Sequence, residues 1–433
     1  MIKGMQVFQK SEKVEESKLY NYDPSDGVNT RVSINDSLGY IEFGAKDSFP
    51  NFVLDTVDGS HTASSCLETI ISFIEGDGFK QESLNTLKVN DKDTFTDVHN
   101  GVSQDEGYFE GFYINVRYNP LGKINYISKL PYDSCRLAIP NPETSKVHHI
   151  YYNPYFGTGD YKEEETVVFP VYNPNSALFE IKDINEFNDE LEEGSEEIKS
   201  YKGQVLFVKE NRPQNKFYPI PFYWSGFRWF DVERKVGEFH NSNLDNNFFL
   251  GGLIKMVGDP NEAFSTALNK DGEEYTTKTV GEAFNEVMED KMSGSSKGGV
   301  TLVTWSDTKG EFPEIEAFPT NANDALFITL QNLAVDNIII SCNTVPLLAN
   351  VQVSGKLGAS QEILNAVALQ HGKIKKRQNK LERAYDMIFA NSIWADVVDP
   401  VKIDPFKFDL LEFGKEEIIE EVIEDKDEAV INK

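Results

Sequence analysis

One unit between residues 321 and 391 constrains the fold of this chain more than any other feature. Residues 321–341 predict a helix about 30 Å long. Its expected apolar stripe consists of Leu326, Leu330, Leu333 and Ile340. Pro346 must end or kink this helix, because proline lacks an amide hydrogen and clashes with the preceding turn. A loop with two glycines and a second helix over 360–391 follow, so the sequence predicts a bent helical element.

The first half of the chain is different in pattern. Between about residues 31 and 209, short alternating or aromatic-rich stretches such as 108–118 and 147–152 are separated by Gly, Pro, Asn and Asp. This pattern is typical of strands. One helix is expected over 64–74, where Leu67, Ile70, Ile71 and Ile74 recur at helical spacing. The highly charged residues 181–200 predict a solvated insertion.

The middle of the chain predicts a compact α/β module between two long helices. Residues 226–246 form the first helix, with Trp229, Val232, Val236 and Phe239 on one face. A strand over 248–257, a helix over 280–292 and a strand over 299–305 follow. Short strands around 397–409 close the folded part. The chain has 433 residues, which is more than a single hydrophobic core can accommodate. We therefore expect an α+β fold of two or three lobes.

The net charge and the cysteines exclude several classes. Seventy-one acidic against 42 basic residues give a net charge of −29, which excludes a simple basic-patch DNA binder. Cys66, Cys135 and Cys342 are too scattered for a disulfide framework or a zinc site. The first 20 residues lack the apolar core of a secretory signal, and no apolar run is long enough to cross a bilayer. We expect no membrane partner.

Motifs of enzymes and metal sites also fail. Residues 294–298 (GSSKG) match the nucleophile-elbow pattern, but the expected order is helix then strand instead of strand then helix. Phosphate-binding, dinucleotide-binding and H-E-x-x-H motifs are missing, so we predict no enzymatic activity and no cofactor. His148 and His149 point to opposite faces of a strand. Residues 91–97 resemble half a calcium loop but lack its glycine, which favours a solvated turn.

Several stretches resemble, in collinear order, the portal proteins of tailed double-stranded DNA phages. Residues 48–79 resemble their opening segment, and 127–137 (ISKLPYDSCRL) the strand that follows it. Residues 218–247 resemble their first stem helix and 248–257 the strand that enters their clip. Residues 339–346 (IISCNTVP) and 355–366 (GKLGASQEILNA) resemble the bend after the second stem helix and the tunnel loop. The resemblance covers about residues 40–405.

The resemblance implies a ring, usually of twelve subunits, at one capsid vertex. Its channel passes double-stranded DNA, without sequence specificity, during packaging and ejection. The large terminase subunit, a head-tail adaptor and the major capsid protein are the implied partners, and the location is the virion, after assembly in the host cytoplasm. The implied parts are an N-terminal arm (1–30), a β-rich wing (31–225 and 360–410), stem helices (226–247 and 320–342), a clip (248–319), a tunnel loop (343–359) and an acidic tail or minimal crown (411–433).

The tunnel loop is the first candidate site. Its residues of interest are Gln352, Ser354, Gly355, Lys356 and Gly358. Lys356 is the only charge of residues 347–359, so one weak phosphate contact is easily made and broken as DNA slides past. Taken without the resemblance, the loop is an ordinary connection between two helices.

Two further sets of residues remain open between two interpretations. Glu233, Glu238, Asp324, Gln331 and Asp336 are the candidates for the channel lining, or else the solvated sides of amphipathic helices. Lys373, Lys375, Lys376, Arg377 and Lys380 form a basic cluster within an acidic chain. The cluster either contacts DNA or pairs with acids, which the acidic tail or a neighbouring subunit supplies.

Two other classes of function stay open at the level of sequence. An acidic hydrolase or nuclease using Asp and Glu with a divalent metal would show metal-dependent cleavage. Another oligomeric capsid or adaptor component would assemble without enclosing a hole wide enough for a duplex. Imaging of the oligomer distinguishes the second class from a portal.

Overall fold

The computed structural model describes residues 2–7, 39–190, 200–213, 217–245, 253–268, 274–284, 302–306, 324–349 and 360–407. Helices and small sheets alternate through these residues, which confirms the α+β class. The chain divides into two compact units. The smaller comprises Met1–Asn21 and Val232–Ala334, and the larger comprises Tyr22–Asp231 and Val335–Lys433.

The larger unit contains more helix than the sequence analysis predicted. Its helices include α1 (Phe49–Asp58), α2 (His61–Glu75), α3 (Glu82–Asn85), α4 (Phe95–Phe109), α5 (Ala177–Asp189) and α9 (Ser360–Phe389). The prediction of strands with a single helix over 31–209 was wrong. Residues 181–190, predicted as part of a solvated insertion, lie in α5 or directly after it, and none of them is buried. In α4, valines, glycine and several polar residues hide the helical pattern, because Ser103, Asp105 and Glu106 lie on its buried side together with Val98 and Val102.

Two three-stranded antiparallel sheets complete the larger unit. The first has the order β3-β2-β7 and the second the order β4-β5-β6. The strands are β2 (Gly111–Tyr118), β3 (Ile124–Leu130), β4 (Cys135–Leu137), β5 (His149–Tyr152), β6 (Val167–Pro170) and β7 (Gln204–Lys209). Seven of the eight residues of β2 are buried, because it is the central strand and α4 packs against it. The larger unit is therefore a mixture of helices and strands and not mainly β.

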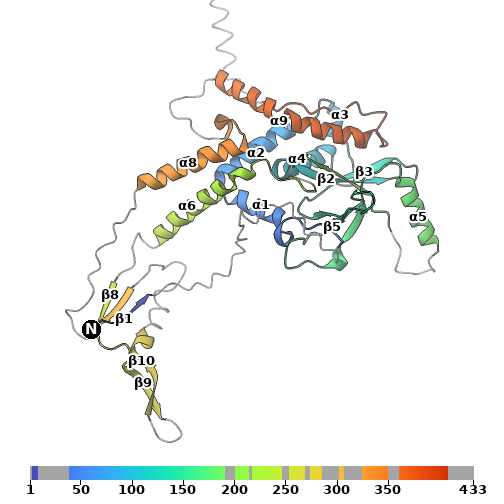
Figure 1. Cartoon of the computed structure of the whole chain (residues 1–433). Helices are drawn as coiled ribbons and strands as arrows, with labels where there is room; N and C mark the ends of the chain where they lie inside the picture. The colour runs from blue at the N-terminus through green and yellow to red at the C-terminus, as the bar shows by residue number, and fades with distance from the viewer. Residues whose placement is uncertain are drawn as a thin grey trace, which may run out of the picture. The chain divides into compact units, whose positions relative to one another are not determined.

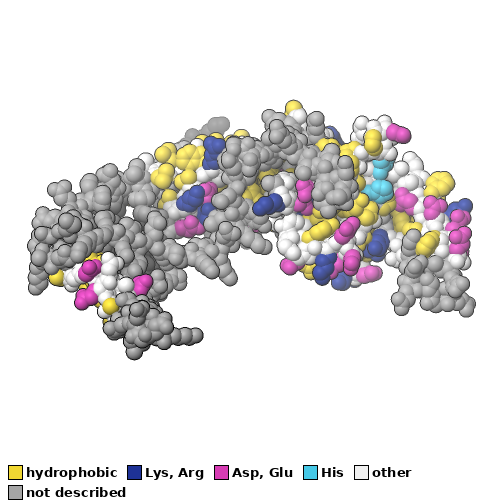
Figure 2. All heavy atoms as spheres, turned by 60° about the horizontal axis from the view of Figure 1, so that its bottom comes forward, with side chains coloured by type: hydrophobic (Ala, Val, Ile, Leu, Met, Phe, Trp, Pro, Cys, Tyr) yellow, Lys and Arg dark blue, Asp and Glu magenta, His cyan; other side chains and the backbone are white. Residues whose placement is uncertain are grey.

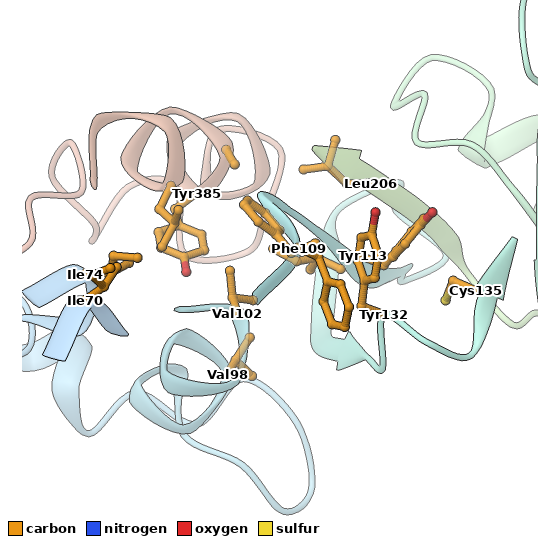
Figure 3. Close-up of a cluster of buried hydrophobic side chains, with 14 of the residues drawn as sticks. Ile70, Ile74, Val98, Val102, Phe109, Tyr113, Tyr132, Cys135, Leu206 and Tyr385 are labelled. Atoms are coloured by element: carbon orange, nitrogen blue, oxygen red, sulfur yellow. The ribbon is translucent and has the colours of Figure 1, made fainter. Parts of the chain in front are cut away.

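The hydrophobic core of this unit lies between α2, α4, α9 and the first sheet (Figure 1). Figure 3 shows Ile70 and Ile74 of α2, Val98 and Val102 of α4, and Tyr385 of α9 converging on one side of it. On the other side Phe109 stacks on Tyr132 with ring centroids 4.4 Å apart. α2 and α4, which lie far from α9 in the sequence, therefore hold α9 in place.

The start of α4 explains residues 91–97. Thr94 caps the helix by accepting from the backbone N–H of Asp97, and the Asp97 carboxylate accepts in return from the backbone N–H of Thr94. This reciprocal capping box satisfies two amides at the helix terminus. The hydrogen bonds from Thr94 lower the pKa of Asp97. The segment is a helix cap, in agreement with the predicted solvated turn.

The smaller unit contains two small sheets. The first is three-stranded, with the order β1-β11-β8, formed by β1 (Ile2–Val7), β11 (Leu302–Ser306) and β8 (Leu253–Val257). β1 is antiparallel to β11, whereas β8 is parallel to it. β9 (Ala263–Leu268) and β10 (Glu274–Thr279) form a separate antiparallel pair. Trp305 of β11 is buried and packs edge-on against Phe284. The strands predicted at 248–257 and 299–305 are present as β8 and β11, and β1 pairs with β11.

The helices predicted at 226–246 and 321–341 are present as α6 (Phe227–Asp245) and α8 (Asp324–Cys342). The apolar stripe predicted for α8 was wrong: Leu333 is 47% and Ile340 75% exposed. The buried face consists of Ala334, Ile338, Ile339 and Cys342. α8 is apolar on nearly every side, so its pattern does not select one face. Its packed face is set by close approach near Gly226, where a Cβ would lie 2.1 Å from the Ser341 hydroxyl.

Candidate functional site

The bend between α8 and α9 is built on fixed supports. α8 ends at Cys342 and Asn343 adopts a left-handed conformation, so the helix stops before Pro346. The 3-10 helix η5 (Pro346–Ala349) follows, and the Leu348 carbonyl accepts a 3.1 Å hydrogen bond from Thr69 of α2. Beyond the bend, Gln370 of α9 accepts from the backbone N–H of Val345 at 3.1 Å. The base of the predicted tunnel loop is therefore tied to α2 and α9.

The five tunnel-loop candidates lie outside the described residues. They are Gln352, Ser354, Gly355, Lys356 and Gly358, and their role stays a prediction.

The basic cluster on α9 has acidic partners within its own chain. The Lys380 ammonium lies 2.7 Å from Glu106 and 3.8 Å from Glu210. Arg377 lies 3.2 Å from Glu110, and Lys376 lies 2.5 Å from Glu210. The Glu110 carboxylate also forms an ion pair with Arg212, at 2.9 Å. These pairs connect the middle of α9 to the end of α4 and to the residues just after β7.

Burial makes this network sensitive to the loss of a partner. Glu106 is 1% exposed, and burial raises the pKa of its carboxyl although the charges of Lys380 and Arg377 oppose this. Burial likewise raises the pKa of Glu110 against the charges of Arg377 and Arg212. Burial acts in the same direction on Glu210, but Lys376 and Lys380 lower its pKa overall. The lysines and arginines therefore counteract the effect of burial on the pKa of these carboxyls.

The other two members of the cluster, Lys373 and Lys375, do not pair with these acids. Lys375 is exposed, and Lys373 donates a 3.0 Å hydrogen bond to the Asn343 carbonyl at the end of α8. Burial lowers the pKa of Lys373. Lys376, Arg377 and Lys380 thus pair with acids, as the second interpretation of the cluster expects, but these acids belong to the larger unit of the same chain and not to the acidic tail. On the face drawn in Figure 2, Lys and Arg side chains are interspersed with Asp and Glu.

The channel-lining candidates do not share one environment. Gln331 and Asp336 are exposed on α8, and Glu238 is exposed on α6 with its carboxylate 2.6 Å from Arg234. Glu233 is only 4% exposed in the chain by itself, so its side chain does not face solvent there. Asp324 is the first residue of α8. Whether these residues line a channel stays a prediction.

Sequence reasoning missed the acidic half of the network. Glu106, Glu110 and Glu210 had no pattern to single them out, since they lie more than 160 positions from the α9 residues they bind. One local feature does mark Glu110: it ends α4 in the left-handed conformation, with φ 58°. That conformation is uncommon for glutamate, but only the fold reveals it.

The described residues hold no group of three His, Cys, Asp or Glu side chains placed to bind a metal ion. His99 is fully buried, where Nδ1 lies 2.9 Å from the Tyr385 hydroxyl, and burial lowers its pKa to about 4. It belongs to the core. Residues 294–298 lie outside the described part of the chain. In that part, the helices are too short or too polar to cross a bilayer.

Comparison with known proteins gives only distant structural similarity. No protein-family model and no curated protein matches the chain. A chain of the virion of a native gene transfer agent particle is similar with a TM-score of 0.48, 10% identity and coverage of 86% of this chain and 88% of that one. A chain from the neck of the native particle, computed with C12 symmetry, is similar with a TM-score of 0.47 and 11% identity. The match covers 84% of this chain and 84% of that one.

A phage portal protein is also among the similar structures. It is an HK97-family portal protein from Corynebacterium diphtheriae, with a TM-score of 0.36, 11% identity and coverage of 81% of this chain and 95% of that one. With TM-scores below 0.5 the similarity carries no argument about the site.

Proposed function

We propose that this chain is a subunit of a phage portal: a ring at one vertex of the capsid whose channel passes double-stranded DNA. The observation that carries the proposal is the collinear order of portal-like stretches over residues 40–405. Two of these stretches meet in the unit formed by α8, the bend at 343–349 and α9. The bend is supported by α2 and α9, while the ten residues between it and α9 contain the single charge Lys356.

The proposed parts follow the predicted division of the chain. α6 and α8 are the stem, the β1-β11-β8 sheet and the β9-β10 pair belong to the clip, and the larger unit is the wing. In this proposal the clip binds the large terminase subunit and later a head-tail adaptor, and the wing lies against the major capsid protein. The acidic charge suits a channel, because a surface rich in Lys and Arg would hold the phosphates and slow the DNA.

The assembly of purified full-length protein tests the proposal directly. We expect closed rings, usually of twelve subunits, with a central hole that admits a DNA duplex. The measurement is negative-stain electron microscopy at micromolar protein in several salt concentrations, together with light scattering for the mass. A protein that stays monomeric in every condition contradicts the proposal, and rings without such a hole favour another capsid component.

Replacing Lys356 with glutamate is expected to impair DNA packaging and leave ring assembly intact. The change turns the one cation between residues 347 and 359 into an anion, which repels the phosphates of the passing duplex. The measurement is the amount of nuclease-protected DNA in particles assembled with the variant. Lys146→Glu, the same charge change at an exposed turn of the wing, is the matched control. Normal packaging by Lys356→Glu would mean that the loop is a passive connection.

A further inference from the structure

The outward face of α9 is uncovered along most of the helix. Residues spaced by three, four or seven share one face of an α-helix. On this face the exposed side chains are Leu364, Ala368, Leu369, Lys375, Lys376 and Arg383. Leu364 is 42% and Leu369 57% exposed, so the first half of the face is apolar and the second half basic. Such a combination fits a partner that has both aliphatic and acidic side chains.

The basic residues of this face differ from those on the buried side of the same helix. Arg377 and Lys380 are 15% exposed and satisfied by Glu110 and Glu106. Lys375 and Arg383, in contrast, form no ion pair with any residue that the structure describes. Lys376 reaches Glu210 but is still 81% exposed. Three cations in a chain of charge −29 therefore point outward beside an apolar surface.

The described part of the chain ends next to this face. The Phe406 carbonyl lies 2.9 Å from Nε2 of His371, and the Phe406 ring packs against Phe73 with centroids 4.9 Å apart. His371 lies three residues after Ala368 and four before Lys375, so all three are on neighbouring turns of one side of α9. Lys407 is the last described residue. The remaining 26 residues, 408–433, therefore begin beside the exposed face.

The sequence of that remaining segment complements the face. Residues 412–428 contain nine acidic residues and two lysines. Ile418, Ile419, Val422 and Ile423 are at helical spacing, and acidic residues flank this stripe on both sides. The ten residues 408–417 span at most about 35 Å, and Leu364 to Arg383 covers about 30 Å of helix. The stripe thus reaches every part of the face.

We propose that the acidic segment 412–428 of this chain docks on the exposed face of α9 of the same chain. Its aliphatic stripe covers Leu364 and Leu369, and its flanking carboxylates pair with Lys375, Lys376 and Arg383. The contact covers the outward basic surface of α9 formed by Lys375, Lys376 and Arg383, and its negative charge repels polyanions from that surface. It does not depend on the portal function, since it requires only the residues of one chain.

Carbodiimide cross-linking of the full-length chain, followed by mass spectrometry, tests the contact. The reagent joins a lysine amine to a nearby carboxylate as an amide with loss of water. We expect links from Lys375 or Lys376 to acidic residues between 416 and 428. The ion pair of Lys376 with Glu210, which the reagent can reach, serves as the internal control of the reaction. An equal mixture of isotopically heavy and light protein reports whether a link joins one chain or two.

Two variants make the result decisive. The double variant Lys375→Glu with Arg383→Glu can form links from the segment to this face only through Lys376. We expect it to lose most of these links, and we expect hydrogen exchange in residues 412–428 to rise several-fold. Lys123→Glu with Lys146→Glu makes the same change of charge at exposed sites of the wing and should leave both unchanged. Unprotected exchange in residues 412–428 of the unmodified chain overturns the proposal. Heavy–light products that make up about half of these links overturn it as well, because random pairing of two chains gives that share and the segment then belongs to a neighbouring copy.

Discussion

Replacing Arg136 with methionine is expected to lower the free energy of unfolding of the larger unit by about 3–5 kcal/mol. Arg136 is 0% exposed, and Nε lies 2.5 Å from the Asp47 carboxylate. Its Nη1 donates to the carbonyls of Asp133 and Cys135 and its Nη2 to the carbonyl of Asp47, while the guanidinium lies over the ring of Phe156. Methionine fills a similar volume but leaves a buried carboxylate and three carbonyls without this donor.

Thermal unfolding and the soluble yield measure this effect. Arg117→Met is the matched control, because Arg117 is exposed on β2 and its guanidinium contacts only the ring of Tyr126 among the interactions described. It should cost less than about 1 kcal/mol. Adding Asp47→Asn to Arg136→Met should recover part of the loss, since it removes the unpaired charge and asparagine tolerates the positive φ of position 47. Equal stability of Arg136→Met and Arg117→Met would show that the pair of Arg136 with Asp47 does not stabilise the fold.

Lys380→Met is expected to destabilise the same unit by about 3 kcal/mol at pH 8 and by clearly less at pH 5. The change leaves Glu106 buried without its nearest cation. Because burial already raises the pKa of Glu106, losing Lys380 raises it further. A carboxyl with a raised pKa in the folded state stabilises the fold below its unfolded-state pKa, and this contribution is lost as the pH rises through the folded-state pKa. The deficit of the variant therefore grows from acid to alkaline pH.

Urea unfolding at the two pH values measures that deficit. Lys375→Met is the control on the same helix, and it should change stability by less than about 0.5 kcal/mol because Lys375 is exposed and makes no ion pair among the described residues. The double variant Lys380→Met with Glu106→Gln should lose the pH dependence. A Lys380→Met deficit that is the same at both pH values would show that packing of the lysine chain, and not its charge, is what matters.

The helical half of the fold was predictable because its signals are local. The helices at 226–246, 321–341 and 360–391 were placed to within a few residues of α6, α8 and α9. Pro346 and the loop glycines mark the break between the last two, and no distant residue is needed to place it. The fold class and the presence of clip strands follow from the same kind of pattern.

Most helices of the larger unit and the acidic partners of the basic cluster were not predictable in this way. α4 buries Asp105 and Glu106 because Lys129 and Lys380 reach them from β3 and α9, so its polar residues do not mark its solvent side. α8 exposes Leu333 and Ile340 because its packed face is chosen by a close approach near Gly226. In both cases the deciding contact comes from residues far away in the sequence, and periodicity contains no information about it.

The pairing of β1 with β11 has a consequence for synthesis. β11, which lies between β1 and β8 in the sheet, follows β1 by about 300 residues in the sequence, so it is translated tens of seconds after β1 at typical elongation rates. Until then the strand has no edge to join, and the first half of the larger unit can fold before it. Completion of this sheet therefore reports that the ribosome has passed residue 306. A nascent chain that stops earlier exposes an unpaired N-terminal strand, which marks it for chaperones or degradation.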